Sequence, residues 1–194
     1  MIEHIEGRLV EKTPTYAVID CGGVGYRIHI SLNTFSRIGD SEKCKLYTHL
    51  AIREDAHVLF GFFEKSEREL FLQLISVSGV GPATARMMLS SSSPAELQDA
   101  IITQNVSLLK NIKGIGAKTA ERIIVDLRGK LQKDTLSASV MFASRLPIVD
   151  EALSALMALG FVKAQAEKAF DKIAKDELQK SNVEQLIKLA LKNL

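Results

Sequence analysis

The sequence contains no tryptophan, only two cysteines and only four prolines among its 194 residues. The two cysteines, Cys21 and Cys44, do not form a CxxC pair, so by themselves they cannot build a zinc or iron–sulfur site. We therefore expect two free thiols in a reducing compartment, with no bound metal and no cofactor.

The chain also lacks long apolar runs and a strong charge of either sign. Without about 18 uninterrupted apolar residues, no transmembrane helix is expected. The N-terminal segment MIEHIEGRLVEK is too charged for a signal peptide, so the expected location is the cytoplasm. The net charge is +2, and the segments 1–63, 64–130 and 131–194 carry −1, +2 and +1. Any contact with nucleic acid must therefore depend on a few placed groups.

Residues 1–63 have the pattern of a small β-domain. Turn signals at Gly22-Gly23 and Gly39-Asp40 separate short alternating or apolar runs. The five predicted strands cover residues 5–10, 16–20, 26–30, 44–50 and 56–62. A sheet of such short strands is marginal unless it closes, which favours a barrel of the OB-fold type.

The rest of the chain has helical spacing, so the fold class is a multidomain α+β protein. Residues 64–131 are predicted to form a tandem helix–hairpin–helix domain, and 147–194 a three-helix, UBA-like bundle; the weakly periodic segment 132–146 between them is expected to be a flexible linker. Pro94 is predicted to open a helix capped by Ser93, and Ser181 or Asn182 is expected to cap the last helix. The predicted helices cover 64–76, 84–89, a segment from 94 onward, a further short helix that leads to 112, and then about 118–131, 150–159, 163–174 and 183–191.

One pattern occurs twice, as SVSGVGPATA at 76–85 and as NIKGIGAKTA at 111–120. The glycines permit a tight reversal between helices and the close approach of another chain. Val80 and Ile115 lie between the glycines and are expected to be buried. The helix that follows each hairpin presents free N–H groups and a positive dipole end, which suit a DNA phosphate.

The repeat and its neighbouring cations form the predicted phosphate-binding site. The hairpins contribute their glycines and apolar residues, and the following helices contribute basic and hydroxyl side chains. The candidate residues are Gly79, Val80, Gly81, Arg86, Gly114, Ile115, Gly116, Lys118, Thr119 and Arg122, with Lys113 nearby.

Two enzymatic alternatives start from the same residues. Residues 114–119 end like a P-loop, but Ala117 stands where glycine is needed and a helical pattern leads in, so no ATPase activity is expected. Lys118 stands where some helix–hairpin–helix glycosylases place an amine nucleophile, but Asp126 continues into a helical pattern. No catalytic residue is assigned. A repair glycosylase and a DNA-binding module without junction preference remain as alternatives.

The order of motifs resembles the RuvA family, which binds Holliday junctions in bacteria, over essentially the full length. The segments that carry the resemblance are GGVGYRIHI (22–30), REDAHVLFGF (53–62), GVGPATA (79–85), GIGAKTAERIIVDL (114–127) and ALMALGF (155–161). It implies a non-catalytic subunit that forms a homotetramer, sometimes an octamer of two facing tetramers. It also implies a four-way junction held in an open square by phosphate contacts, without base reading.

The same resemblance assigns further roles. Glu54 and Asp55 match the family's acidic pin, whose charge would repel phosphates at the strand crossover. The C-terminal bundle would recruit the RuvB motor for ATP-driven branch migration in recombination and repair, and RuvC would resolve the junction afterwards. The apolar residues expected to contact RuvB, or otherwise to form the bundle core, are Leu156, Leu159, Phe161 and Leu191.

The sequence departs from the common family pattern at Ala83 and Ala117, where many members carry lysine. At least two phosphate-directed charges are therefore missing. We expect backbone N–H groups to carry more of the grip, and junction binding to depend less steeply on salt than in a more basic member.

Overall fold

The structure of the chain is a computed structural model that describes residues 2–39, 41–141, 147–171, 173 and 182–193. It divides into two compact units, Met1–Gln132 and Lys133–Leu194. The first unit holds both the predicted β-domain and the helix–hairpin–helix domain, and the second corresponds to the C-terminal bundle.

A closed five-stranded barrel opens the first unit, as the turn signals and short strands predicted. The strands are β1 (His4–Lys12), β2 (Tyr16–Cys21), β3 (Val24–Ile30), β4 (Lys43–Ile52) and β5 (His57–Phe62). Their order around the barrel is β1-β2-β3-β5-β4, and only the β3–β5 pair is parallel. The OB-like barrel of the predicted fold class is thereby confirmed.

Alternation along the strands fills the barrel interior with apolar side chains. Ile19, Ile28 and Leu46 are fully buried there, because successive side chains point to opposite faces of a strand. Cys44 is also buried, and burial raises the pKa of its thiol. The cysteine therefore behaves as a small core residue in this barrel.

A short helix that the sequence did not predict, α1 (Leu32–Arg37), connects β3 to β4. Ser31 caps it, since its side chain accepts a hydrogen bond from the backbone N–H of Thr34. Six residues are too few for a clear apolar periodicity, so only the cap residue signalled the helix.

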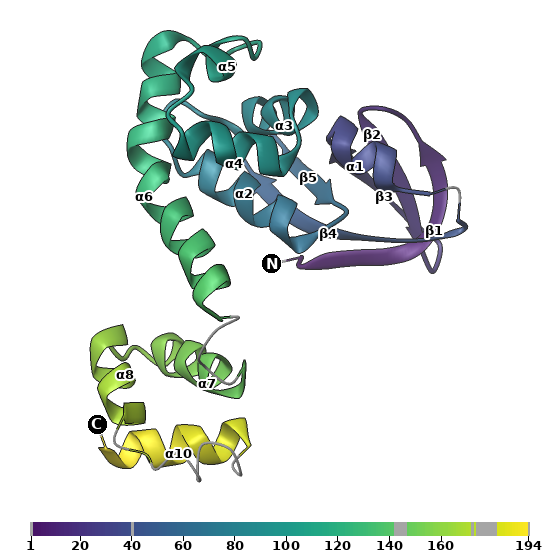
Figure 1. Cartoon of the computed structure of the whole chain (residues 1–194). Helices are drawn as coiled ribbons and strands as arrows, with labels where there is room; N and C mark the ends of the chain where they lie inside the picture. Colours follow the sequence, from purple (N-terminus) through teal and green to yellow (C-terminus); the bar gives the residue numbers. More distant parts are fainter. Residues whose placement is uncertain (1, 40, 142–146, 172, 174–181, 194) are drawn as a thin grey trace. The chain divides into compact units, whose positions relative to one another are not determined.

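Five helices follow the barrel: α2 (Lys65–Ile75), α3 (Pro82–Ser91), α4 (Pro94–Ile102), α5 (Val106–Lys110) and α6 (Ala117–Met141), the last of which continues past Gln132, where the first unit ends. The capping box predicted at Ser93 is present, with Glu96 as its second member. Helix α2 lies against β4 and β5 (Figure 1). Phe60 and Phe62 of β5 contact the ring of Phe71 on α2. Phe60 and Phe62 thus belong to the core cluster of the helices, whereas the residues inside the barrel form a separate cluster. The predicted boundary near residue 63 falls between β5 and α2.

Helix α6 corrects the predicted linker. The sequence suggested a helix ending near Leu131 and irregular backbone from 132 to 146, but the helix continues to Met141. Serine and alanine in this stretch are compatible with a helix even though they give little apolar periodicity. Residues 142–146 lie outside the described residues.

The second unit contains α7 (Pro147–Ala158), α8 (Lys163–Asp171) and α10 (Val183–Asn193). Leu156, Phe170 and Leu186 are buried in a common core. Asn182 caps α10, because its side chain accepts from the backbone N–H of Gln185. The alternative cap, Ser181, lies outside the described residues.

Candidate nucleic-acid interface

The two glycine hairpins have the same backbone geometry. Gly79 and Gly114 both have φ of 93°, a left-handed conformation that favours glycine. In each turn the N–H after that glycine donates back over 3.0 Å, from Val80 to Val77 and from Ile115 to Ile112. The sequence repeat is therefore a structural repeat as well.

The apolar residue at the centre of each hairpin anchors it to the core. Val80 is 4% exposed and Ile115 is 6% exposed, and both belong to the core cluster of the first unit. This burial, predicted from the pattern, fixes the hairpin backbone against the helices. The glycines around these residues lie at the surface.

The second glycine of each hairpin is not required by the fold of this chain. Gly81 has φ of −87°, which any residue can adopt, and Gly116 is not among the positive-φ glycines. A Cβ atom at either position would meet no atom within 4 Å. The space beside both glycines is therefore free for the close approach of another molecule.

A helix begins directly after each of these glycines. The N–H groups in the first turn of α3 and of α6 have no acceptor within their helix. Pro82 at the start of α3 has no N–H, whereas Ala117 at the start of α6 has one. Both ends present the positive pole of the helix dipole to the solvent side of the hairpins, a suitable arrangement for an anion.

The hairpins differ in charge. When the repeats are aligned, Ala83 corresponds to Lys118, Ser78 to Lys113 and Met87 to Arg122. All three cations of the second hairpin are exposed. Thr119, the last predicted contact, is half-buried in the first turn of α6.

Arg86, the cation predicted at the first hairpin, is hydrogen-bonded to the barrel domain. Its Nη1 donates to the backbone oxygen of Thr15 over 2.9 Å, which joins α3 to the β1–β2 connection. Burial lowers the pKa of this guanidinium. Burial, followed by the charges of Arg86 and Arg27, lowers the pKa of nearby His29. His29 is therefore neutral near pH 7 and adds no charge beside the first hairpin.

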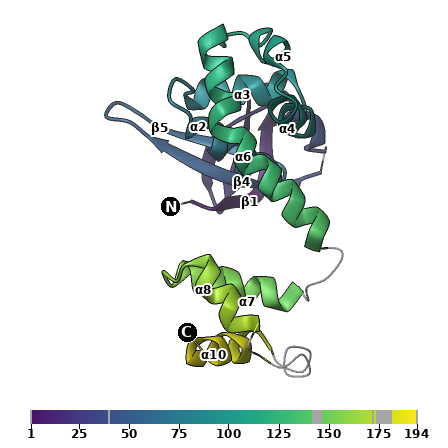
Figure 2. The same cartoon turned by 60° about the vertical axis from the view of Figure 1, so that its left-hand side comes forward.

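Glu54 and Asp55 lie at the tip of the β4–β5 hairpin, which Figure 2 shows reaching out from the barrel. Arg53 N–H donates to the oxygen of Ala56 and closes the tip, and both carboxylates are exposed. A surface cavity of about 300 Å³ is lined by residues of this tip and of the first hairpin, among them Arg53, Asp55, Pro82 and Ala83. The tip and the first hairpin thus border one hollow.

The predicted motor-binding residues divide into two groups. Leu156 is fully buried and Phe161 packs partly against the same core, whereas Leu159 and Leu191 are 64% and 43% exposed. Leu156 therefore forms part of the bundle core, which is the alternative left open for these residues. Two exposed apolar residues that the sequence analysis did not select are Met157 and Val162.

The backbone around the second hairpin differs from what a P-loop or a glycosylase site requires. Helix α5, not a strand, leads to the second hairpin, unlike a P-loop. Lys118 and Asp126 lie eight residues apart on α6, which separates them by about 12 Å along the helix axis. A nucleophile and a catalytic carboxylate of one glycosylase site would need to be closer than this.

Among the residues that the structure describes, no three or more His, Cys, Asp or Glu side chains are grouped so that they could hold a metal ion. None of the helices in the same part of the chain combines the length and apolar character needed to cross a membrane.

Comparison with known proteins agrees with the resemblance seen in the motifs. Family models described as RuvA N terminal domain, SAM-like helix-hairpin-helix tandem and RuvA C-terminal domain match residues 1–61, 71–130 and 147–194. A protein of Christiangramia forsetii is 53% identical over 194 residues, and one of Bacteroides fragilis is 51% identical over 202. A protein of Flavobacterium psychrophilum is 50% identical over 198. The matches cover 100% of each chain, and each relative is named Holliday junction branch migration complex subunit RuvA.

Proposed function

The chain belongs to the RuvA family, and on that premise we propose that it binds four-way DNA junctions as a non-catalytic subunit of a branch-migration complex. The single observation that carries the proposal is the duplicated hairpin. Two copies of one turn, each with an unobstructed glycine before a helix, form two equivalent anion sites on one domain. Two such sites can hold a duplex arm by its phosphates without reading its bases.

The proposed contacts to phosphate come from the backbone and from a few side chains. The N–H groups at the starts of α3 and α6 donate to phosphate oxygens, with Thr119 beside the second. Lys118 and Arg122 add charge at that hairpin, and Arg86 adds a half-buried guanidinium at the first. Charge-assisted hydrogen bonds of this kind are stronger than neutral ones.

The acidic tip gives the site its preference for junctions. In a homotetramer, four copies of Glu54 and Asp55 place about eight negative charges near the four-fold axis. They repel the phosphates at the crossover, keep the four arms apart in an open square and disfavour a continuous duplex. Octamers of two facing tetramers would enclose the junction from both sides.

The C-terminal bundle is the proposed contact to the RuvB motor, which supplies ATP hydrolysis, and RuvC acts on the junction in a larger complex. The exposed apolar residues Leu159 and Leu191 are suited to a protein contact, while half-buried Phe161 supports them. Exposed Met157 and Val162 extend the same proposal to two further residues. Leu156 belongs to the core and contributes only indirectly.

The test of this function compares a four-way junction with a duplex of equal length, for the wild type and for Glu54→Gln/Asp55→Asn. We expect the wild type to prefer the junction and to cleave neither DNA. The double variant should bind the duplex as well or better, because repulsion is removed, and its ratio of junction to duplex affinity should fall.

The matched control removes one glutamate and one aspartate elsewhere. Glu69→Gln/Asp99→Asn changes two exposed carboxylates on α2 and α4. It should leave the affinity ratio as it is in the wild type. An unchanged ratio in the tip variant would refute the role of the tip, and strand cleavage by the purified chain would favour a glycosylase instead.

A further inference from the structure

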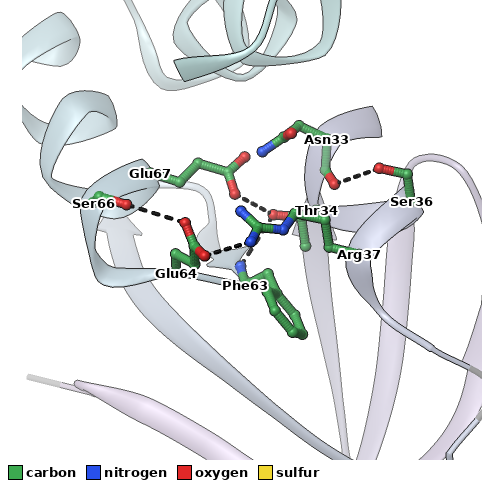
Figure 3. Close-up of polar contacts among 8 residues, drawn as sticks. All are labelled: Asn33, Thr34, Ser36, Arg37, Phe63, Glu64, Ser66 and Glu67. Carbon is green, nitrogen blue, oxygen red and sulfur yellow. Dashed lines mark hydrogen bonds and ion pairs between the residues drawn. The ribbon is translucent and has the colours of Figure 1, made fainter. Parts of the chain in front are cut away.

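A buried carboxylate connects the barrel to the helix that leads to the first hairpin. Glu67, in the first turn of α2, has no exposed surface. Its Oε1 accepts from the hydroxyl of Ser31 over 2.5 Å, and its Oε2 accepts from the hydroxyl of Thr34 over 2.7 Å. Both partners lie at the start of α1 and are themselves fully buried. Figure 3 shows the carboxylate of Glu67, on α2, pointing toward Thr34 on α1.

The directions of these hydrogen bonds are fixed by the backbone. The Ser31 hydroxyl oxygen accepts from the N–H of Thr34, and the Thr34 hydroxyl oxygen accepts from the N–H of Phe63. Each hydroxyl therefore turns its own proton toward Glu67, so both carboxylate oxygens act as acceptors. Two hydrogen-bond relays, each running from a backbone N–H through a hydroxyl, therefore end on the carboxylate of Glu67.

The hydrogen-bond network joins the elements that lead to the acidic tip and to the first hairpin. Phe63 directly follows β5, the second strand of the acidic hairpin, and α2 ends four residues before Gly79. Helix α1 is also joined to α3, because the N–H of Leu32 donates to the hydroxyl of Ser90 over 3.1 Å. Helix α1 and Glu67 thus provide one hydrogen-bonded connection between the barrel, which carries the tip, and the helices that carry the first hairpin.

Stability alone is a poor reason for a carboxylate at this position. Burying a charge carries a desolvation cost, and replacing a buried ionic group together with its partners by apolar side chains of similar volume often costs no stability. The neighbouring ring contacts of Phe71 with Phe60 and Phe62 are apolar, and much of what they contribute is hydrophobic burial, which has no direction. Hydrogen bonds to a carboxylate restrict both distance and angle, and hence the orientation of the packed elements.

We propose that Glu67 is a positioning residue for junction selectivity: with Ser31 and Thr34 it fixes the angle between the barrel that carries the acidic tip and the helices that carry the hairpins. The proposal rests on the proposed junction binding. Binding of a duplex arm requires only the hairpins. Binding of a junction requires the hairpins and the acidic tip together, in one fixed relative orientation. Loss of the network therefore affects junction binding selectively.

The test uses the full-length chain with Glu67→Gln, which keeps the size of the side chain but replaces one acceptor with a donor. Thr34→Val, which removes one relay and keeps the carboxylate, serves as a second variant if the first fails to fold. The control is Glu69→Gln, an exposed residue of the same helix that undergoes the same change in charge.

Two measurements are made on each variant. Equilibrium binding gives the affinities for a four-way junction and for a duplex of equal length. Spin labels at Arg53→Cys and Lys113→Cys, in a chain with Cys21→Ser and Cys44→Ala, give the distribution of distances between the tip and the second hairpin. Labelled chain is diluted with unlabelled chain so that only distances within one subunit are measured.

Glu67→Gln and Thr34→Val are expected to broaden the distance distribution and to lower junction affinity about tenfold. Their duplex affinity should change by less than about twofold, and Glu69→Gln should resemble the wild type in both measurements. An unbroadened distribution, or equal losses for junction and duplex, would overturn the proposal. If the wild type itself shows no preference for junctions, the proposed function fails, and the distance distributions alone still decide whether Glu67 fixes the geometry.

Discussion

The two hairpins of the first unit share a backbone and differ in almost every polar side chain around it. Gly79 and Gly114 have the same φ, and the turns close with hydrogen bonds of the same length. Yet the second hairpin carries Lys118 where the first carries Ala83. What is repeated is the geometry of the N–H groups, not the charge. In the proposed function, the backbone N–H groups therefore hold the phosphates and side-chain charge modulates the binding.

The surroundings of the hairpins differ as well. The first hairpin continues into α3, which is tied to the barrel through Arg86 and Ser90. The second continues into α6, whose 25 residues extend to Met141. The first hairpin is therefore fixed to the barrel side of the unit, and the second is the more basic of the two.

The largest loss of junction affinity is expected when the backbone contact shared by the two hairpins is obstructed. Gly81→Ala and Gly116→Ala each place a methyl group where the phosphate approaches, and neither substitution strains the chain, since the backbone permits it and the space is empty. Each should weaken junction binding by about tenfold or more, because a hydrogen bond to a charged acceptor contributes about 1.5–3 kcal/mol. Equilibrium binding with thermal unfolding of the same samples makes the measurement.

The matched control for the glycine variants is Gly129→Ala in the interior of α6, where a Cβ atom also meets nothing within 4 Å. It should leave junction affinity unchanged and stabilise the chain by about 0.5–1 kcal/mol, since alanine favours a helix over glycine. If Gly81→Ala and Gly116→Ala also bind like the wild type, the backbone does not approach the phosphate.

A smaller change in junction affinity is expected when a cation is removed from the second hairpin or added to the first. Lys118→Ala should reduce the slope of log affinity against log salt by about one, and Ala83→Lys should increase it by about one. Affinity should change severalfold in the corresponding directions. The double variant Ala83→Lys/Lys118→Ala moves the charge from one hairpin to the other and should restore the wild-type slope. Binding titrations at four salt concentrations provide the measurement.

The comparison would be contradicted by a double variant that keeps the altered slope of Lys118→Ala. That result would mean that the two hairpins are not equivalent sites and that only the second contacts phosphate. The interpretation of Arg86 as an added cation at the first hairpin would then also lose its support.

The sequence predicted the hairpins well because their geometry is local. The spacing of glycines and apolar residues in 76–85 and 111–120 determines the turn, the buried residue and the start of the next helix. The barrel was predictable for a similar reason, since short alternating runs between turn signals leave few other folds. In both cases the information lies within about ten residues.

Contacts between distant residues were not predictable in the same way. The partners of Glu67 lie 33 and 36 residues before it in the chain, and nothing in the local pattern marks this glutamate as buried. The bond from Arg86 to Thr15 spans 71 residues. Leu156 and Leu159 look alike in the sequence, and only the packing of the bundle separates a core residue from an exposed one.

The most direct measurement compares the loss of affinity when two backbone contacts are obstructed with the loss when two cations are removed. Junction affinity at one salt concentration is measured for Gly81→Ala/Gly116→Ala and for Lys118→Ala/Arg122→Ala. Backbone contacts at both hairpins predict a loss of about 100-fold or more for the glycine pair, whereas exposed charges contribute less and predict about tenfold for the cation pair. A cation pair that loses as much affinity as the glycine pair, or more, would contradict the claim that the backbone holds the phosphates.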